Sequence, residues 1–314
     1  MPLCQPVLLI HGGAGAPSRS HLNSALEEEL RSNFRLILTR GVDDLVEGSS
    51  ALDVVTDAVI SLESCPHLNA GVGSVFNCRG EHELDASIMC GSTGRAGSVS
   101  CVKSIEHPIL AARGLLESGG HVMLVGEGAE AFAAGIGLKH VDNSHFSTPY
   151  RLSQLEAAKA VGSVVLDGGI EKGKMGTVGA VAIDKFGNLA AATSTGGMTN
   201  KQVGRVGDTP CIGAGTFSDT LVAVSCTGSG EAFMRVCAAK EVACAMEFGG
   251  HSVSTAAELV LKKISQFDGS GGIIAVASNG DIALPFNTEG MFRGFMREGE
   301  RPVVGIYRGD ERSA

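Results

Sequence analysis

Three clusters of small polar residues in the second half of the chain offer hydroxyl groups that could act as nucleophiles or hydrogen-bond donors. Each joins threonine to glycine beside a predicted strand, and their sequences are GTVG at 176–179, TSTGG at 193–197 and CTGSGE at 226–231. For any single cluster the plainer interpretation is favoured, because threonine suits strands and glycine suits turns. A buried hydroxyl needs a hydrogen-bond partner, however, so three such clusters together indicate a site.

An arginine and an aspartate three residues apart lie between the second and third clusters. Arg205 and Asp208 stand in the glycine-containing run GRVGDTP at 204–210. Their opposite charges could hold the carboxylate and the ammonium group of a small zwitterion. The alternative for this pair is an ordinary surface salt bridge, which the flanking glycines make the weaker interpretation.

Several common catalytic motifs are absent from the sequence. The chain has no G-x-S-x-G elbow, no G-x-x-x-x-G-K-[ST] or G-x-G-x-x-G loop, and no H-E-x-x-H pair, since His82-Glu83 is followed by Leu84-Asp85-Ala86. The nine histidines are dispersed. The hydroxyl clusters therefore remain the best candidates for chemistry.

The composition is that of an ordered globular protein. Of 314 residues, 44% are hydrophobic and 19% are charged, and the net charge is −9. An acidic chain with two tyrosines and no tryptophan is a poor partner for nucleic acid. No apolar run approaches the ~20 residues that span a bilayer, so we expect no membrane partner.

The nine cysteines are scattered without a C-x-x-C pair, which favours reduced thiols. The beginning of the chain has no basic segment, and the apolar run 7–10 is too short for a secretory signal. We therefore expect a cytoplasmic protein.

The first half of the chain predicts one strand, then helices, then further strands. In the second helix, residues Ala51, Val54, Val55 and Ala58 recur at helical spacing, and Ser50 is a plausible N-cap. The predicted strands are 7–10, 74–76, 83–89 and 98–105, and the predicted helices are 23–40, 51–62, 108–117 and 128–134.

A polar segment with weak periodicity, 141–176, separates the halves. We expect a short helix at 151–160 within it and a mobile linker at its end. The second half then predicts strands again, with hairpin turns at 185–187 and at Asn279-Gly280. The predicted strands are 177–184, 188–195, 221–226, 272–278 and 282–286, and the predicted helices are 230–246 and 254–264.

Hairpin turns imply antiparallel pairing, whereas a Rossmann-like fold needs single strands alternating with helices. Two stacked, mainly antiparallel sheets with helices outside would bury all the predicted apolar faces. We therefore predict an α/β protein with a single domain over 1–314, built as a four-layer α/β/β/α sandwich.

Long motifs throughout the chain resemble the plant-type L-asparaginase/isoaspartyl peptidase family of N-terminal-nucleophile hydrolases. The matching runs are HGGAG at 11–15, LNAGVGS at 68–74, ELDASIM at 83–89, HVMLVGEGA at 121–129, MGTVGAVAID at 175–184, NLAAATSTGG at 188–197 and LPFNTEGM at 284–291. The resemblance implies the same four-layer fold. It also implies cleavage between Gly176 and Thr177 into an α subunit (1–176) and a β subunit (177–314), which would assemble as a dimer of αβ heterodimers.

The resemblance further implies a role for each candidate site residue. Thr177 would be the nucleophile, and its own α-amine, with a pKa of about 7.7–8.0, would be the base. Thr195 would hydrogen-bond that hydroxyl, Thr227 and the Gly228 N–H would stabilise the oxyanion, and Asn69 would orient a water or carbonyl near the scissile bond. Arg205 would hold the substrate α-carboxylate and Asp208 the α-ammonium group.

The resemblance implies no catalytic cofactor but does imply a structural sodium ion. Its ligands would be backbone carbonyls in a single loop, those of Leu62, Glu63, Cys65, Leu68, Ala70 and Val72.

The implied activity is hydrolysis of isoaspartyl dipeptides and L-asparagine. Two alternatives stay open: a glycosylasparaginase-like amidase, and an unprocessed binding protein without catalysis. Ser229 stands where relatives often carry threonine or histidine, so the leaving-group preference is open as well.

Overall fold

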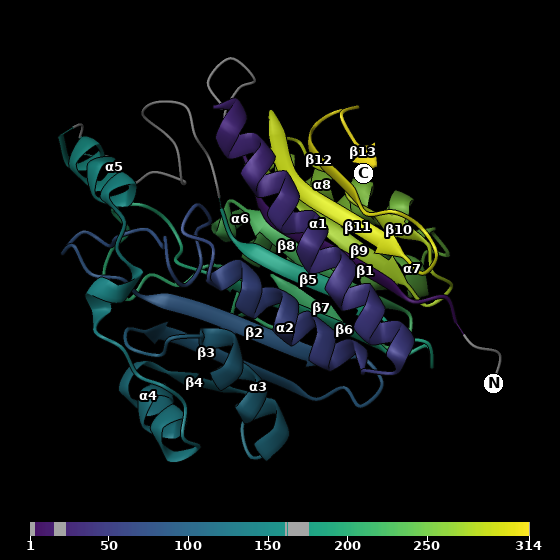
Figure 1. Cartoon of the computed structure of the whole chain (residues 1–314), viewed down its shortest axis with the longest axis horizontal. Coiled ribbons are helices and arrows are strands. Elements are labelled where there is room, and N and C mark those ends of the chain that lie inside the picture. The colour runs from purple at the N-terminus through teal and green to yellow at the C-terminus, as the bar shows by residue number, and fades with distance from the viewer. Residues whose placement is uncertain (1–3, 16–22, 161, 163–175, 314) are drawn as a thin grey trace.

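A computed structural model describes residues 4–15, 23–160, 162 and 176–313. Its larger sheet has nine strands in the order β13-β12-β11-β1-β5-β6-β2-β3-β4, and every neighbouring pair is antiparallel except β3 with β4 (Figure 1). The central strand β5 lies between β1 and β6. The strands of this sheet are β1 (Val7–Ala14), β2 (Leu84–Cys90), β3 (Ala96–Val102), β4 (Met123–Val125), β5 (Val178–Ile183), β6 (Leu189–Thr195), β11 (Gly290–Arg297), β12 (Val303–Tyr307) and β13 (Arg312–Ser313).

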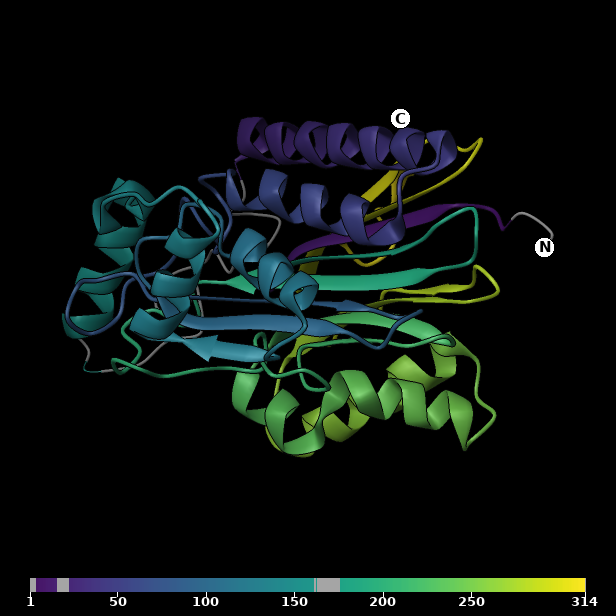
Figure 2. The same cartoon turned by 90° about the horizontal axis from the view of Figure 1, so that it is seen from below.

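The smaller sheet has four antiparallel strands in the order β10-β9-β8-β7. Helices cover the outer faces of both sheets, and the two sheets pack face to face between them (Figure 2). The remaining elements are β7 (Thr216–Ser218), β8 (Val222–Gly228), β9 (Gly271–Ala277), β10 (Ile282–Ala283), α1 (Ser24–Glu47), α2 (Ala51–Glu63), α3 (Pro108–Ser118), α4 (Gly126–Gly135), η1 (Asn143–Phe146), α5 (Pro149–Ala160), α6 (Gly230–Val236), α7 (Ala238–Glu247) and α8 (Val253–Ser265).

Alternation along strand β1 shows how the layers form. Leu8 and Ile10 point to the core under α1 and α2, whereas Val7 and Leu9 point to the core between the sheets. Successive side chains of a strand point to opposite faces, so a continuous apolar run fits a strand that is buried on both sides. A third core lies between the smaller sheet and helices α6, α7 and α8. The predicted four-layer sandwich is confirmed.

The local helix predictions are mostly confirmed. Ser50 caps α2, since its hydroxyl oxygen accepts a hydrogen bond from the Asp53 N–H at 3.1 Å. The hairpin between β5 and β6 and the hairpin between β9 and β10 are antiparallel, as expected. The predicted helix at 151–160 corresponds to α5. The rest of the expected linker, 163–175, lies outside the described residues, so its mobility stays a prediction.

Two element predictions are wrong. Residues 74–76 form no strand, and in their place Asn77 alone bridges to Lys201. The predicted helix 230–246 is divided into α6 and α7 at Cys237, whose backbone is left-handed with φ 51°. Nothing in a helical hydrophobic pattern marks such a break, because the apolar spacing continues through it.

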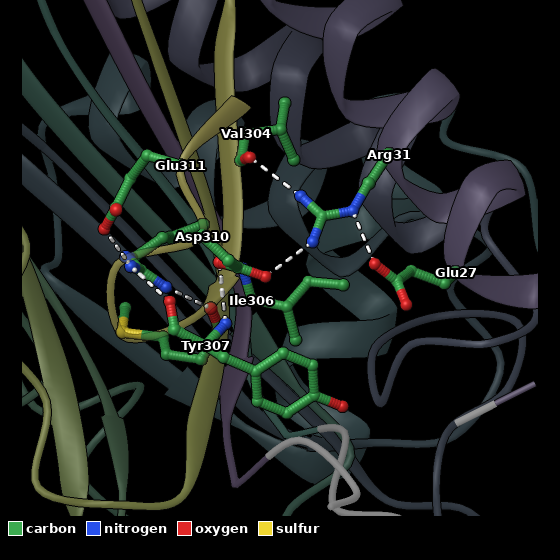
Figure 3. A network of polar contacts seen from close by, with 9 residues as sticks. Glu27, Arg31, Val304, Ile306, Tyr307, Asp310 and Glu311 are labelled. Carbon is green, nitrogen blue, oxygen red and sulfur yellow. Dashed lines mark hydrogen bonds and ion pairs between the residues drawn. The ribbon is translucent and has the colours of Figure 1, made fainter. Parts of the chain in front are cut away.

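The C-terminal strands are tied to α1 by a buried ion pair (Figure 3). The Arg31 side chain is 1% exposed, and its guanidinium group donates to Asp310 Oδ2 at 2.7 Å and to the Val304 carbonyl oxygen at 2.8 Å. Asp310 Oδ1 in turn accepts the backbone N–H groups of Ile306 and Tyr307. This network holds the end of the chain on its first helix.

Among the described helices, none combines the length and the apolar character that crossing a membrane requires. All nine cysteines lie in the described ranges, and each is a free thiol.

Candidate active site

Two of the predicted threonines face each other at one end of the larger sheet. Thr177 directly precedes β5 and Thr195 ends β6, which pairs with β5 in the register Val178 to Ser194. The Thr177 hydroxyl donates a hydrogen bond to Thr195 Oγ1 at 3.0 Å, and the Gly197 N–H donates to the same oxygen at 3.0 Å. The structure therefore holds the proposed nucleophile against its predicted partner in a buried place.

The third threonine reaches the same place from the smaller sheet. Thr227 lies near the end of β8, and its Oγ1 accepts the Ala14 N–H at 3.4 Å. A Cβ built on Gly176 would lie 3.4 Å from this oxygen. Thr227 thus borders the Gly176–Thr177 peptide bond, the predicted cleavage site.

Gly13 makes room for that peptide bond. Its φ is +106°, a conformation that favours glycine, and a Cβ there would lie only 2.2 Å from the Gly176 nitrogen. Gly228 is a second position of this kind, with φ +146° and a Cβ that would lie 2.2 Å from the Ser270 carbonyl oxygen. At both positions a side chain would collide with a neighbouring backbone segment, so only glycine fits.

Arg205 forms an ion pair that the sequence did not reveal. Its Nε and Nη2 atoms donate to the two carboxylate oxygens of Glu231, each at 2.9 Å, and the pair is partly exposed. Glu231 belongs to the third cluster, in the first turn of α6. A glutamate directly after the T-G-S-G run was the available signal for it. Arg205 pairs with Glu231 rather than with Asp208.

Asp208 is buried next to this arginine. The residue is 4% exposed, and its Oδ2 atom has no hydrogen-bond partner among the residues that the structure describes. Burial raises the pKa of Asp208 to about 7, although the nearby Arg205 charge opposes the shift. A Cβ on Gly230 would lie 2.9 Å from Arg205 Nη2 and 3.0 Å from Asp208 Oδ1, so glycine lets the backbone approach both groups closely.

Asn69 supports the turn that follows Thr195. Its amide Nδ2 donates to the Gly197 carbonyl oxygen at 2.8 Å, and its Oδ1 accepts the Val75 N–H at 3.0 Å. The Asn69 backbone carbonyl also accepts the Gly196 N–H at 3.0 Å. The side chain is thus adjacent to the site through the turn, and its expected contact with a water or carbonyl at the scissile bond stays a prediction.

The loop after α2 has the oxygen donors that a sodium ion would need. Within the described chain, no hydrogen bond reaches the carbonyl oxygens of Leu68, Ala70 and Val72. Those of Glu63 and Cys65 each accept one, from the N–H groups of Val72 and Leu68. The Leu62 carbonyl oxygen also accepts a hydrogen bond, from the Cys65 N–H at 3.1 Å. A carbonyl has two lone pairs, so these oxygens keep acceptor capacity, and a sodium ion at this loop stays a prediction.

Two further side chains show what sequence reasoning missed or left open. Ser229 does not face the site freely, because its Oγ accepts the Ser270 N–H at 3.0 Å. His11 was not among the predicted site residues, yet it lies between the sheets with its Nε2 atom 2.9 Å from Ser225 Oγ. Burial lowers the pKa of His11 to about 3, so the ring is neutral at physiological pH.

Comparison with known proteins identifies the family. A family model described as asparaginase matches residues 4–306. An isoaspartyl peptidase of Salmonella typhimurium is 53% identical over 310 residues, covering 96% of this chain and 98% of the relative. Proteins named isoaspartyl peptidase/L-asparaginase are 40% identical in Danio rerio, covering 97% of this chain and 96% of the relative, and 41% identical in Homo sapiens, covering 91% of each chain. The chain belongs to the asparaginase family that this model describes.

Proposed function

We propose that the chain is a self-processing threonine hydrolase that cleaves isoaspartyl dipeptides and L-asparagine. The observation that carries the proposal is the 3.0 Å hydrogen bond between Thr177 and Thr195, formed where Thr227 borders the Gly176–Thr177 bond. The names of the relatives support the substrate class, since isoaspartyl peptidases and L-asparaginases both hydrolyse a β-carbonyl amide.

Maturation would use the same hydroxyl as catalysis. The Thr177 oxygen attacks the Gly176 carbonyl carbon, its proton passes to the departing Thr177 nitrogen, and an ester joins the two residues. Water then hydrolyses the ester, which frees the Gly176 carboxylate and the Thr177 α-amine. The contact of Gly13 with Gly176 supports this step, because it confines the bond that must react.

Catalysis would then proceed through an acyl-enzyme. The Thr177 amine takes the hydroxyl proton, and the oxygen attacks the substrate β-carbonyl carbon. Thr227 and the Gly228 N–H stabilise the oxyanion, each donor being worth roughly 3 kcal/mol. The leaving amine or ammonia departs with a proton from the Thr177 ammonium group, and water then releases aspartate from the ester.

Substrate recognition would rest on two opposite charges. Arg205 binds the α-carboxylate and Asp208 binds the α-ammonium group of the aspartyl part. The proximity of the two groups supports this assignment, since a Cβ on Gly230 would lie 2.9 Å from Arg205 Nη2 and 3.0 Å from Asp208 Oδ1. Isoaspartyl dipeptides and asparagine both carry these two groups beside a β-carbonyl.

Three further features belong to the proposal. A structural sodium ion is held by the carbonyls of Leu62, Glu63, Cys65, Leu68, Ala70 and Val72, and it would keep Asn69 in place. The mature subunits 1–176 and 177–314 assemble as a dimer of αβ heterodimers. The free thiols support a reducing, cytoplasmic location.

The intact mass and the N-terminal sequence of the incubated protein test the proposal. We expect two fragments, one of which begins Thr177-Val178-Gly179, and hydrolysis of β-aspartyl dipeptides and asparagine thereafter. Thr177→Ala should stay whole and inactive, whereas Thr177→Ser retains a hydroxyl and should still divide. A wild-type chain that remains undivided and inactive would contradict the proposed function.

A further inference from the structure

A polar layer lies between the two sheets directly beneath the candidate site. It contains five side chains, each 0% exposed: His11, Ser87, Thr193, Thr216 and Ser225. Farther from the site the same interface is apolar, and its residues include Val7, Leu9, Val181, Ala191 and Val276. Buried hydroxyls in an otherwise apolar interface call for a physical reason.

The side chains of the polar layer form one continuous chain of contacts. His11 Nε2 lies 2.9 Å from Ser225 Oγ, and Ser225 Oγ lies 2.7 Å from Thr193 Oγ1. Thr216 Oγ1 lies 2.5 Å from Thr193 Oγ1 and 2.7 Å from Ser87 Oγ.

Every one of these contacts crosses from one sheet to the other. His11, Thr193 and Ser87 belong to β1, β6 and β2 of the larger sheet, whereas Ser225 and Thr216 belong to β8 and β7 of the smaller sheet. An apolar interface tolerates small displacements, because its attraction has no direction. A hydrogen bond fixes both distance and angle, so the polar layer determines how the sheets are placed relative to each other.

One end of the polar layer lies under the reacting threonines. Thr193 is two residues before Thr195 and Ser225 is two residues before Thr227, so each pair shares one face of its strand. Gly179 stands two residues after Thr177, and a Cβ there would lie 2.1 Å from Ser225 Oγ and thus collide with the layer.

The other end of the polar layer reaches the loop that carries Asp208. Ser87 donates to the carbonyl oxygen of Thr209 at 2.6 Å, and Thr209 directly follows Asp208. The layer thus connects the nucleophile end of the site with the substrate-binding end.

We infer that the polar layer is a positioning device for the reaction. Its hydrogen bonds place Thr227, on the smaller sheet, against Thr177 and Thr195 on the larger one, and Ser87 places the Asp208 loop. None of the five side chains would touch the substrate. The inference rests on the proposed function. It predicts that the Ser225 end of the layer affects kcat and that the Ser87 end affects KM.

Thr193 allows the hydrogen bonds to be separated from packing. Thr193→Val keeps the volume but removes the hydroxyl, and it should lower kcat by about tenfold or more, because a misplaced Thr227 would stabilise the transition state less. Thr193→Ser keeps the hydroxyl and should stay within about threefold of wild type. A layer that serves packing alone predicts the reverse order, with the serine variant impaired.

Serine-to-alanine substitutions at the two ends of the polar layer provide a second test. Ser225→Ala should lower kcat with KM nearly unchanged, whereas Ser87→Ala should raise KM about tenfold with kcat nearly unchanged. A matched control is Thr56→Val in α2, on the outer face of the larger sheet, which removes a buried hydroxyl that donates to the Leu52 carbonyl oxygen and accepts from Arg113 Nη1. Thr56→Val should leave both kinetic parameters unchanged.

The outcomes separate this inference from the proposed function. If wild type hydrolyses β-aspartyl dipeptides while Thr193→Val and both alanine variants retain its kcat and KM, the inference is wrong and the proposed function stands. If Ser225→Ala and Ser87→Ala change kcat and KM alike, in proportion to lost thermal stability, the layer is structural only. A wild type inactive on both substrates overturns the proposed function and the inference with it.

Discussion

Asp208 carries a carboxyl group whose ionisation depends on what lies beside it. Burial raises its pKa to about 7 in the ligand-free protein. A bound α-ammonium group would supply the missing positive partner and lower that pKa again. In the proposed binding mode Asp208 would have to ionise, so protons would compete with the ligand near neutral pH.

Binding of aspartate should weaken as the pH falls through this range. We expect its Kd to rise roughly tenfold between about pH 7.5 and about pH 6, because most Asp208 side chains become protonated. Titration calorimetry at several pH values measures the effect. Succinate, which lacks the α-ammonium group, is the control ligand and should show no such rise. An equal pH dependence for both ligands would assign the titration to another group.

At the residue scale, the sequence indicated which candidate residues lie together better than it indicated their contacts. The pairing of Thr177 with Thr195 was implied by the family resemblance, and the structure shows that the hairpin between β5 and β6 brings the two hydroxyls together. The Arg205–Glu231 pair could not, since 26 residues and a change of sheet separate the two. His11 was missed because a lone histidine has no sequence signal for burial.

At the element scale, α1 and the C-terminal strands depend on one buried guanidinium group. Removing one partner of a buried ion pair leaves the other charge without compensation. Arg31→Met should therefore destabilise the protein by about 3–5 kcal/mol, measured by urea unfolding of an undivided Thr177→Ala background. Arg35→Met, which breaks an exposed pair with Glu28 on the same helix, should cost under about 1 kcal/mol. Equal losses in the two variants would contradict the assigned role of Arg31.

The strands and helices were predictable where periodicity and turn residues agree. Such signals are present in the strand β1, in the helix α2 with its Ser50 cap, and in the hairpin between β5 and β6. The break at Cys237 and the short strand β7 have none, because tertiary contacts and not local preference determine them. The relative placement of the two sheets could not be predicted either. Hydroxyl contacts across the interface join residues far apart in the chain, so no regular sequence spacing marks them.

At the scale of the whole molecule, two buried histidines should make the fold sensitive to acid. Burial lowers the pKa of His11 to about 3 and that of His82 to about 4. The unfolded chain takes up protons at these residues below about pH 6.5, whereas the folded chain does not. Their stabilising contribution is therefore present above that pH and is lost as the pH falls towards 4 and 3.

Asp208 has the opposite effect on the pH dependence of stability. Because its pKa is raised, the folded chain takes up a proton as the pH falls through about 7, whereas the unfolded chain does so only at lower pH. Asp208 therefore increases the free energy of unfolding as the pH falls. We expect the two histidines to dominate, so urea midpoints of the Thr177→Ala chain should decrease steadily below about pH 6.5. Adding His82→Gln should flatten this decrease, and adding Asp208→Asn should steepen it. Midpoints that do not change with pH would show that these groups remain solvated.

The strand order has a consequence for how the protein refolds after denaturation. β1 of the first segment lies between β5 and β11 of the second, and β6 of the second lies against β2 of the first. A chain divided before Thr177 would hold together as two interleaved pieces, but after denaturation those pieces would have to find each other in solution. Recovery from urea would then be a bimolecular reaction whose yield depends on protein concentration, whereas the undivided chain recovers independently of concentration. In a chain that is later divided, the covalent link would act as a folding tether that is needed only once.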